Sequence, residues 1–200
     1  MDAFASNTNE YSGKHFVGLN LAGHSIVEKV FEDCEFRGCD LSGATLKQCK
    51  LIECRFMDCN LSLLNVASSK FSEVELAECK AIGINWTRAS WPRLMLAAPL
   101  KFRQCILNDS SFFGLQLADL VIEDCKARDV DFREANLSSA NLTYTDFANS
   151  LFNRTNLGGA DFSEATNYDI DVFSNEIKRA KFSRFEAIRL LDCLEIELVD

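Results

Sequence analysis

Residues 131–147 read DFREANLSSANLTYTDF, and a large apolar residue returns at every fifth position of this stretch. These residues are Phe132, Leu137, Leu142 and Phe147. The same spacing gives eighteen apolar residues in succession from Tyr11 to Leu96, and a second run of fifteen from Phe102 to Val172 that only Asn167 interrupts. A period of five matches neither the 3.6-residue period of an α-helix nor the two-residue period of a strand. The pattern therefore indicates an internal repeat, and the repeat decides the fold.

Each five-residue unit has a smaller residue two positions before its large apolar centre and a turn residue two positions after it. Eight of the nine cysteines occupy the smaller position, and eight of the nine glycines occupy the turn position. Glycine suits a tight corner because it adopts backbone angles that other residues resist. Five residues bury too little surface to be stable alone, so the units must coil and stack on one another.

Two consecutive units, residues 135–139 (ANLSS) and 140–144 (ANLTY), follow the pattern A-(D/N)-(L/F)-x-x. This pattern, kept over roughly residues 11–172, resembles the pentapeptide-repeat family. The resemblance implies an all-β fold, a right-handed quadrilateral β-helix with one unit per side and twenty residues per coil. Such a coil places phenylalanines in two stacked columns inside a dry core. The expected columns are Phe16, Phe36 and Phe56, and Phe112, Phe132 and Phe152.

The repeat shifts by one residue between Leu96 and Phe102, within a segment, 88–101, that contains both prolines. Proline cannot donate a hydrogen bond to a strand ladder, so the segment marks a break. We expect a kink, or a short helical turn from Leu94 to Ala98, that joins two stacks; a single bulged corner is the alternative. The predicted organisation is an N-terminal arm (1–10), an N-terminal stack (11–96), a C-terminal stack (97–172) and a C-terminal helix with a tail (173–200).

After Val172 the sequence favours a helix. Ser183 and Glu186 have the spacing of a capping box, and apolar residues follow at near-helical intervals. An open end of a β-helix must be covered, so this α-helical module predicts a cap; because its apolar stripe is wider than a lid needs, it also predicts a homodimer interface. A plain monomeric cap is the alternative. The expected interface residues are Phe185, Ile188, Leu190, Leu191, Leu194, Ile196 and Leu198.

The cysteines and histidines do not indicate catalysis. The spacing of Cys49, Cys54 and Cys59 does not match that of zinc ligands, and the repeat explains these thiols as small interior side chains. His15 and His24 lie in no pattern typical of a catalytic triad. A filled rod also offers no cleft for paired carboxylates. We therefore expect no enzyme activity, no cofactor, no metal and no small-molecule substrate.

The chain is acidic, with a net charge of −9, and residues 101–200 hold 18 acidic and 11 basic side chains. With twenty residues per coil, several aspartates should gather along one edge of the C-terminal stack, although ordinary solvation explains each of them singly. The expected edge consists of Asp109, Asp129 and Asp169, which share one column with Asn149, and of Asp131 and Asp171, two residues past that column on the next side. An acidic rod is unsuited to nucleic-acid binding but suits the basic surface that binds DNA.

Several segments resemble the gyrase-interacting members of the family, most closely the albicidin- and microcin-resistance proteins. They are residues 86–92, 167–168, 177–180 and 190–198. The resemblance implies a dimeric DNA mimic that binds bacterial DNA gyrase and confers resistance or self-immunity to a gyrase poison of the albicidin, microcin or quinolone type. Plasmid quinolone-resistance members carry projecting loops, whereas the one-residue shift here predicts no large loop. The alternative is a protein-interaction scaffold with a non-topoisomerase partner.

Neither a signal peptide nor a membrane-spanning stretch is evident in the sequence, so a cytoplasmic protein without membrane contact is expected.

Overall fold

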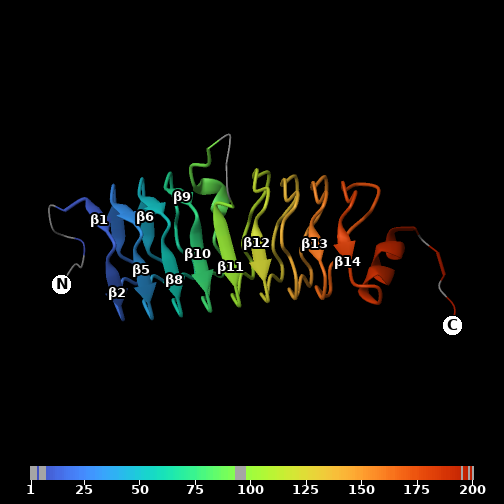
Figure 1. Ribbon diagram of the computed structural model, residues 1–200, viewed down its shortest axis with the longest axis horizontal. Coiled ribbons are helices and arrows are strands. Elements are labelled where there is room, and N and C mark those ends of the chain that lie inside the picture. The colour runs from blue at the N-terminus through green and yellow to red at the C-terminus, as the bar shows by residue number, and fades with distance from the viewer. Residues whose placement is uncertain (1–3, 5–7, 93–97, 195, 198, 200) are drawn as a thin grey trace.

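The computed structural model describes residues 4, 8–92, 98–194, 196, 197 and 199, and it places them in one β-solenoid of about 8 coils (Figure 1). The coils follow one another along a rod, and the two ends of the chain lie at its opposite ends. The elements are β1 (Glu10–Ser12), β2 (His15–Val17), β3 (Ser25–Val27), β4 (Val30–Glu32), β5 (Glu35–Arg37), β6 (Thr45–Lys47), β7 (Lys50–Ile52), β8 (Arg55–Met57), β9 (Lys70–Ser72), β10 (Val74–Ala77), η1 (Trp86–Arg88), β11 (Leu100–Arg103), β12 (Val121–Glu123), β13 (Asp161–Phe162), β14 (Lys181–Phe182) and η2 (Glu186–Leu194).

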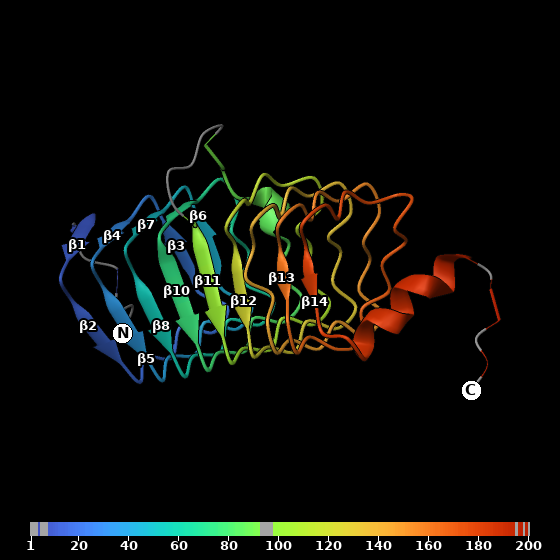
Figure 2. The same ribbon diagram turned by 45° about the vertical axis from the view of Figure 1, so that its right-hand side comes forward.

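The strands pair in parallel with the strands of the neighbouring coils. The largest sheet has six strands in the order β12-β11-β10-β8-β5-β2, and a second side carries the four-stranded sheet β1-β4-β7-β9 (Figure 2). Phe16 pairs with Phe36 and Phe36 with Phe56, which confirms the twenty-residue coil. Five-residue units and twenty-residue coils together give the solenoid four sides.

The large apolar centres fill the interior. Both predicted aromatic columns are confirmed: the ring centroids of Phe36 and Phe56 lie 4.6 Å apart with nearly parallel planes, and those of Phe112 and Phe132 lie 5.3 Å apart. At the N-terminal end, Phe4 packs edge-on against Tyr11, Phe16 and Phe31 and covers the first coil. Parallel stacking inside a dry core stabilises the contact between successive coils.

The small inward residues connect the coils through hydrogen bonds. The Cys59 thiol donates to the carbonyl oxygen of Phe36 at 3.4 Å and accepts the backbone N–H of Cys39 at 3.3 Å. Ser69 makes the same pair of contacts at 2.9 Å each, with the carbonyl of Leu46 and the N–H of Cys49. These thiols are buried, as expected, but they serve as hydrogen-bonding groups as well as small apolar ones.

The break in the repeat contains more residues than predicted. Val74 of β10 pairs with Leu100 of β11, a separation of 26 residues where other coils have 20. Trp91 still stacks on Phe71 as its coil requires, so six additional residues lie between Trp91 and Leu100. The expectation of a break of one residue is therefore wrong, and the expectation of no large loop falls largely on 93–97, outside the described residues. An insertion of six shifts a five-residue period by one, and the sequence alone could not distinguish it from an insertion of one.

The strand ladder continues through this break, because β10 and β11 pair within the six-stranded sheet. The short helix that precedes the insertion is η1, a 3₁₀-helix at Trp86–Arg88. The helical turn expected from Leu94 to Ala98 and the stack boundary expected at 96/97 fall largely or wholly on 93–97, outside the described residues.

The solenoid also extends beyond Val172, where the sequence analysis ended it. Asn156 forms a bridge with Glu176, and β13 pairs with β14. One side of the preceding coil is two residues short, since Phe152 forms a bridge with Ile170 instead of with residue 172, and the next side is two residues longer, since Asn156 again pairs twenty residues on with Glu176. The side chain of Tyr168 consequently fills the core position that the exposed Asn167 interrupts in the repeat.

Candidate partner-binding surfaces

The corners of the solenoid fix carboxylates in outward positions. Eight glycines and 22 other described residues have positive φ, and twelve of those 22 are aspartate or glutamate. Such a conformation costs a non-glycine residue about 1–2 kcal/mol, but the corner backbone forms hydrogen bonds between coils. The N–H of Asp33 (φ 50°), for example, donates to the carbonyl of Ile52 at 3.0 Å. The fold therefore determines where each corner carboxylate stands.

Eight of these carboxylates form two rows, one along each edge of the six-stranded sheet. The first acidic row contains Asp58, Glu78 and Asp124, which follow strands of the sheet, and Glu164, which follows β13 further along the same side. The second acidic row precedes the strands and contains Asp33, Glu53, Glu73 and Asp119. All eight are exposed, and none forms an ion pair with another described residue. Successive corners in a row are about 4.8 Å apart, the spacing of paired strands.

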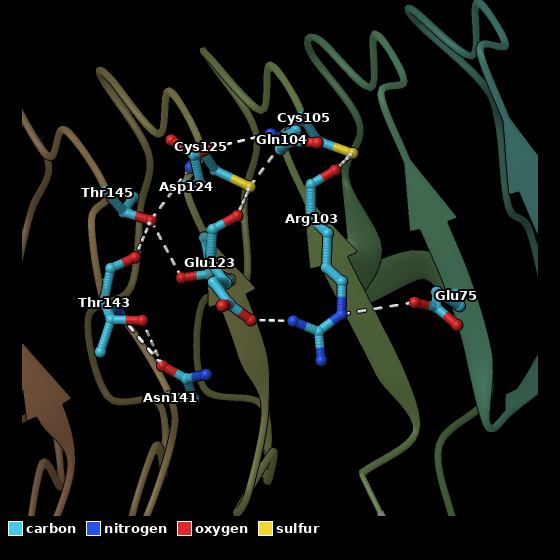
Figure 3. Close-up of polar contacts among 11 residues, drawn as sticks. Glu75, Arg103, Gln104, Cys105, Glu123, Asp124, Cys125, Asn141, Thr143 and Thr145 are labelled. Atoms are coloured by element: carbon cyan, nitrogen blue, oxygen red, sulfur yellow. Dashed lines mark hydrogen bonds and ion pairs between the residues drawn. The ribbon is translucent and has the colours of Figure 1, made fainter.

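The sheet between the rows is close to neutral because its charged side chains pair across coils. Arg103 on β11 lies between Glu75 on β10, at 3.4 Å, and Glu123 on β12, with which it also forms an ion pair (Figure 3). Next to it, the Gln104 amide donates to Asp124 at 3.0 Å. The net negative charge of this side therefore lies on its two edges.

Sequence reasoning missed these rows. Each member stands two positions after an apolar centre, at the corner position that glycines occupy in other units. The unknown length of the insertion also prevented a continuous assignment of columns on this side of the rod.

The predicted edge is divided by the structure. Asp109 and Asp129 do share a corner column with Asn149, since their N–H groups donate to the carbonyls of Arg128 and Ala148. The prediction that Asp169 belongs to the same column is wrong, because the side of the coil that contains Asp169 is two residues short. Asp131 lies on the adjacent side and forms a bidentate ion pair with Arg133, at 2.9 and 2.8 Å.

Beside this ion pair lies a hollow of about 220 Å³. Asp169 and Asp171 line it together with Arg133, Leu151 and Phe152, so three of the five predicted aspartates lie in or next to one small region. One carboxylate oxygen of Asp171 accepts the N–H of Phe173 at 2.7 Å, and this bond lowers the pKa of Asp171. Arg133, whose guanidinium holds the pKa of Asp131 low, also lies over the Phe113 ring at 5.7 Å.

At the C-terminal end, polar side chains attach the final helix to the last coil. Ser183 accepts the N–H of Glu164 at 2.7 Å, Glu186 accepts the N–H of Asn167 at 2.7 Å, and Arg189 donates to the carbonyl of Tyr168 at 3.0 Å. Ser183 and Glu186 thus bind corner residues of the solenoid rather than capping their own helix. The helix is the 3₁₀-helix η2, not the α-helix that was predicted.

The apolar residues of this end divide into an inner and an outer group. Leu190 packs against the core and Leu191 is half-buried, whereas Phe185 is 88% exposed, Ile188 52% and Ile196 54%. Leu194 is exposed as well, and Leu198 lies outside the described residues. The outer group is an apolar surface with no partner among the described residues.

The cysteine thiols are poorly suited to act as nucleophiles. All nine cysteines are free, and eight are buried. Burial raises the pKa of the Cys54 thiol to about 11, and the hydrogen-bonded Cys125 thiol, together with burial, raises that of Cys105 to about 12.

No group of three His, Cys, Asp or Glu side chains in the described part of the chain is arranged to hold a metal ion. No helix in that part has the length and apolar character to cross a membrane.

Comparison with known proteins identifies the repeat. The sequence profile described as "Pentapeptide repeat region" matches residues 29–98 and 84–162. Among curated proteins, none matches the chain in sequence.

The solved structures that it resembles include QnrB1, a plasmid-mediated fluoroquinolone resistance protein. A trypsin-treated variant of QnrB1 has a TM-score of 0.71 and 18% identity, and the match covers 96% of this chain and 100% of that one. The full-length form has a TM-score of 0.56 at 19% identity, with 94% and 100% covered. At this identity the likeness concerns the fold.

Proposed function

The chain belongs to the pentapeptide-repeat family, and from this premise we propose that it mimics DNA and binds bacterial DNA gyrase or a related type II topoisomerase. By occupying the DNA site, it would change the response of the enzyme to a poison and so confer resistance or self-immunity. The family resemblance, the net charge of −9 and the rod shape support this proposal. The main structural support for the proposal is the pair of acidic rows.

The rows place negative charges at regular intervals along the rod, as phosphates are placed along a DNA duplex. Eight carboxylates without ion pairs stand on about seven coils of ~4.8 Å each, or roughly one charge per 4 Å of rod. Duplex DNA carries one charge per about 1.7 Å. The rod thus has about two-fifths of the charge density of DNA, enough to steer it to a basic surface. We therefore expect salt to weaken its binding less steeply than it weakens the binding of DNA.

We further propose a homodimer in which the exposed apolar side chains in and next to η2 meet those of a second copy. An isologous contact at this end would join two rods end to end and extend the acidic rows through both. The exposure of Phe185, Ile188, Leu194 and Ile196 supports this contact. The polar bonds of Ser183, Glu186 and Arg189 hold the helix in place for it.

The six-residue insertion bears on which poison is countered. Projecting loops distinguish quinolone-resistance members of the family, and a one-residue shift argued against one here. With six additional residues between Trp91 and Leu100, that objection no longer holds. The proposal accordingly covers quinolones as well as peptide poisons of the albicidin and microcin types.

We place the protein in the cytoplasm, where it acts by binding and not by catalysis. Free cysteines are typical of a reducing compartment, and all nine are free. The interior is filled by side chains, in keeping with a protein that acts through its surface.

The test is a gyrase supercoiling assay with and without a poison. The purified protein should inhibit supercoiling or restore it in the presence of albicidin, microcin or a quinolone. The variant Asp58→Asn/Glu78→Gln/Asp124→Asn/Glu164→Gln removes the charge of the first acidic row. It should weaken the effect about tenfold or more and reduce its dependence on salt.

A matched variant removes the same charge elsewhere, as Glu10→Gln/Glu28→Gln/Glu32→Gln/Glu176→Gln, and should change the effect less than about twofold. Equal losses in the two variants would show that net charge acts and not the row. If the unmodified protein neither inhibits nor protects, the proposed function is wrong, and a scaffold with a non-topoisomerase partner becomes the better explanation.

A further inference from the structure

The side of the rod that contains Asp131 holds one of its own arginines in a specific way. The Arg133 guanidinium makes two hydrogen bonds to the Asp131 carboxylate and lies 5.7 Å from the centre of the Phe113 ring. A planar guanidinium can make both contacts at once, because two of its N–H groups bind a carboxylate while its flat face lies against an aromatic ring. An aspartate and a phenylalanine thus form the holding site for this arginine.

The same two residue types recur at the other side of the hollow. Asp169 and Asp171 line it, and Phe173 lies two residues after Asp171, with its N–H bonded to the Asp171 carboxylate. Phe173 is 77% exposed, and neither aspartate forms an ion pair with a described residue. In the next coil of the solenoid, Asn153 takes the position of Arg133. Arg133 itself lines the hollow, but its guanidinium is already bound by Asp131.

The walls of the hollow suit the aliphatic part of a long side chain. Leu151 and Phe152 line it, and Leu151 is 48% exposed. Its volume of about 220 Å³ is smaller than the ~300–1,000 Å³ that small-molecule sites usually have. It is suited to a single side chain presented by a protein surface.

We propose that this hollow is an anchor for one arginine of a protein partner, with Asp169 and Asp171 binding the guanidinium and Leu151, Phe152 and Phe173 contacting the methylene groups and an adjacent apolar residue. Because two carboxylates line the hollow, a basic side chain is the occupant that fits it. Because exposed apolar residues surround it, the partner segment that carries this side chain should also contain apolar residues. The inference rests on the proposed function for the identity of the partner, but not for the chemistry of the site.

The anchor can be tested without the partner. The full-length chain, labelled with ¹⁵N, is titrated with the peptide acetyl-Gly-Arg-Leu-Gly-amide and followed by NMR. The backbone amides of residues 150–153 and 169–174 should shift and reach saturation. A peptide with citrulline, which is neutral and nearly the same shape as arginine, should bind about tenfold or more weakly.

The variant Asp169→Asn/Asp171→Asn should also lose about tenfold or more in affinity. Asparagine keeps an oxygen that can accept the Phe173 N–H, so the turn is preserved, and an unchanged far-ultraviolet spectrum checks the fold. The matched variant Asp109→Asn/Asp129→Asn removes two exposed carboxylates that do not line the hollow and should bind the peptide within about twofold of the unmodified chain. Equal binding of the citrulline peptide, or equal losses in both variants, would overturn the proposal.

The test of the anchor and the test of the proposed function can give different results. If the arginine peptide binds as expected while gyrase is unaffected by the protein, the anchor stands and the gyrase proposal is wrong. If gyrase is affected but the peptide does not bind at these residues, the anchor is wrong and the gyrase proposal stands.

Discussion

The small residue of each unit lies where two coils meet, and this position explains its chemistry. A side chain there can reach both a carbonyl and an N–H of the preceding coil, as Cys59 and Ser69 do. Ser110 and Thr145 occupy equivalent positions and make both bonds, and the Thr155 hydroxyl donates to the carbonyl of Phe132 in the same way. A hydroxyl and a thiol are interchangeable in this role, so the abundance of cysteine in this chain needs no catalytic explanation.

At this scale we predict the effect of changing Ser69. Ser69→Ala removes both bonds of a fully buried hydroxyl and leaves the N–H of Cys49 and the carbonyl of Leu46 without it, which should cost about 1–3 kcal/mol in the free energy of unfolding. Ser69→Cys retains both contacts in the geometry of Cys59 and should cost less than the alanine variant. Denaturant unfolding measures both, and an equally large loss in the cysteine variant would contradict the hydrogen-bonding role.

Among the elements, the insertion between Trp91 and Leu100 is the clearest case in which the sequence pattern gave an incomplete answer. A hydrophobic period reports position only within one unit, so it recorded a shift of one where six residues are inserted. The ladder supplied the missing information, since the pairing of Val74 with Leu100 counts residues directly. The pairing also keeps β10 and β11 in one sheet.

We predict that removal of the six residues 94–99 leaves the solenoid intact. The deletion restores a separation of twenty residues between Val74 and Leu100, so the free energy of unfolding should change by no more than about 1 kcal/mol. Deletion of five residues, 94–98, leaves one residue in excess and should be more destabilising. Denaturant unfolding distinguishes the two, and the reverse order would contradict the register.

The same six-residue deletion also tests the role of the insertion. If the insertion acts in protection from quinolones, the deleted protein should lose that protection in the supercoiling assay while it still inhibits gyrase. Retained protection would show that the insertion has no part in it.

The molecule as a whole is a rod whose two ends and four sides differ. Its N-terminal end is covered by Phe4, and its C-terminal end by a helix that makes polar bonds and an apolar contact of Leu190 with the rod and has exposed apolar side chains on the outside. One side carries the two acidic rows, and another carries the hollow beside Arg133. The proposed dimer and the proposed partner therefore use different surfaces.

At this scale we predict that Phe185→Asp/Ile188→Asp converts a dimer to a monomer. The unmodified protein should have twice the 22.5 kDa mass of one chain in light scattering at micromolar concentration, because the apolar side chains of η2 would be buried between copies. The variant should have the mass of one chain, since buried carboxylates without partners are costly. Asn149→Asp/Asn153→Asp adds the same charge at exposed polar positions and should remain dimeric. A monomeric unmodified protein would rule out the interface.

The sequence by itself determined the repeat, the all-β solenoid, the aromatic columns and the burial of eight cysteines, because a five-residue period places the same residue types inside in every coil. Only the tertiary structure decided the length of the insertion, the shortened side of a coil that puts Tyr168 in the core and moves Asp169 out of its column, and the solenoid bonds of Ser183 and Glu186. It also decided which carboxylates are left without ion pairs. These features depend on contacts between coils, and such contacts require an exact count of residues around each coil, which a local period does not contain.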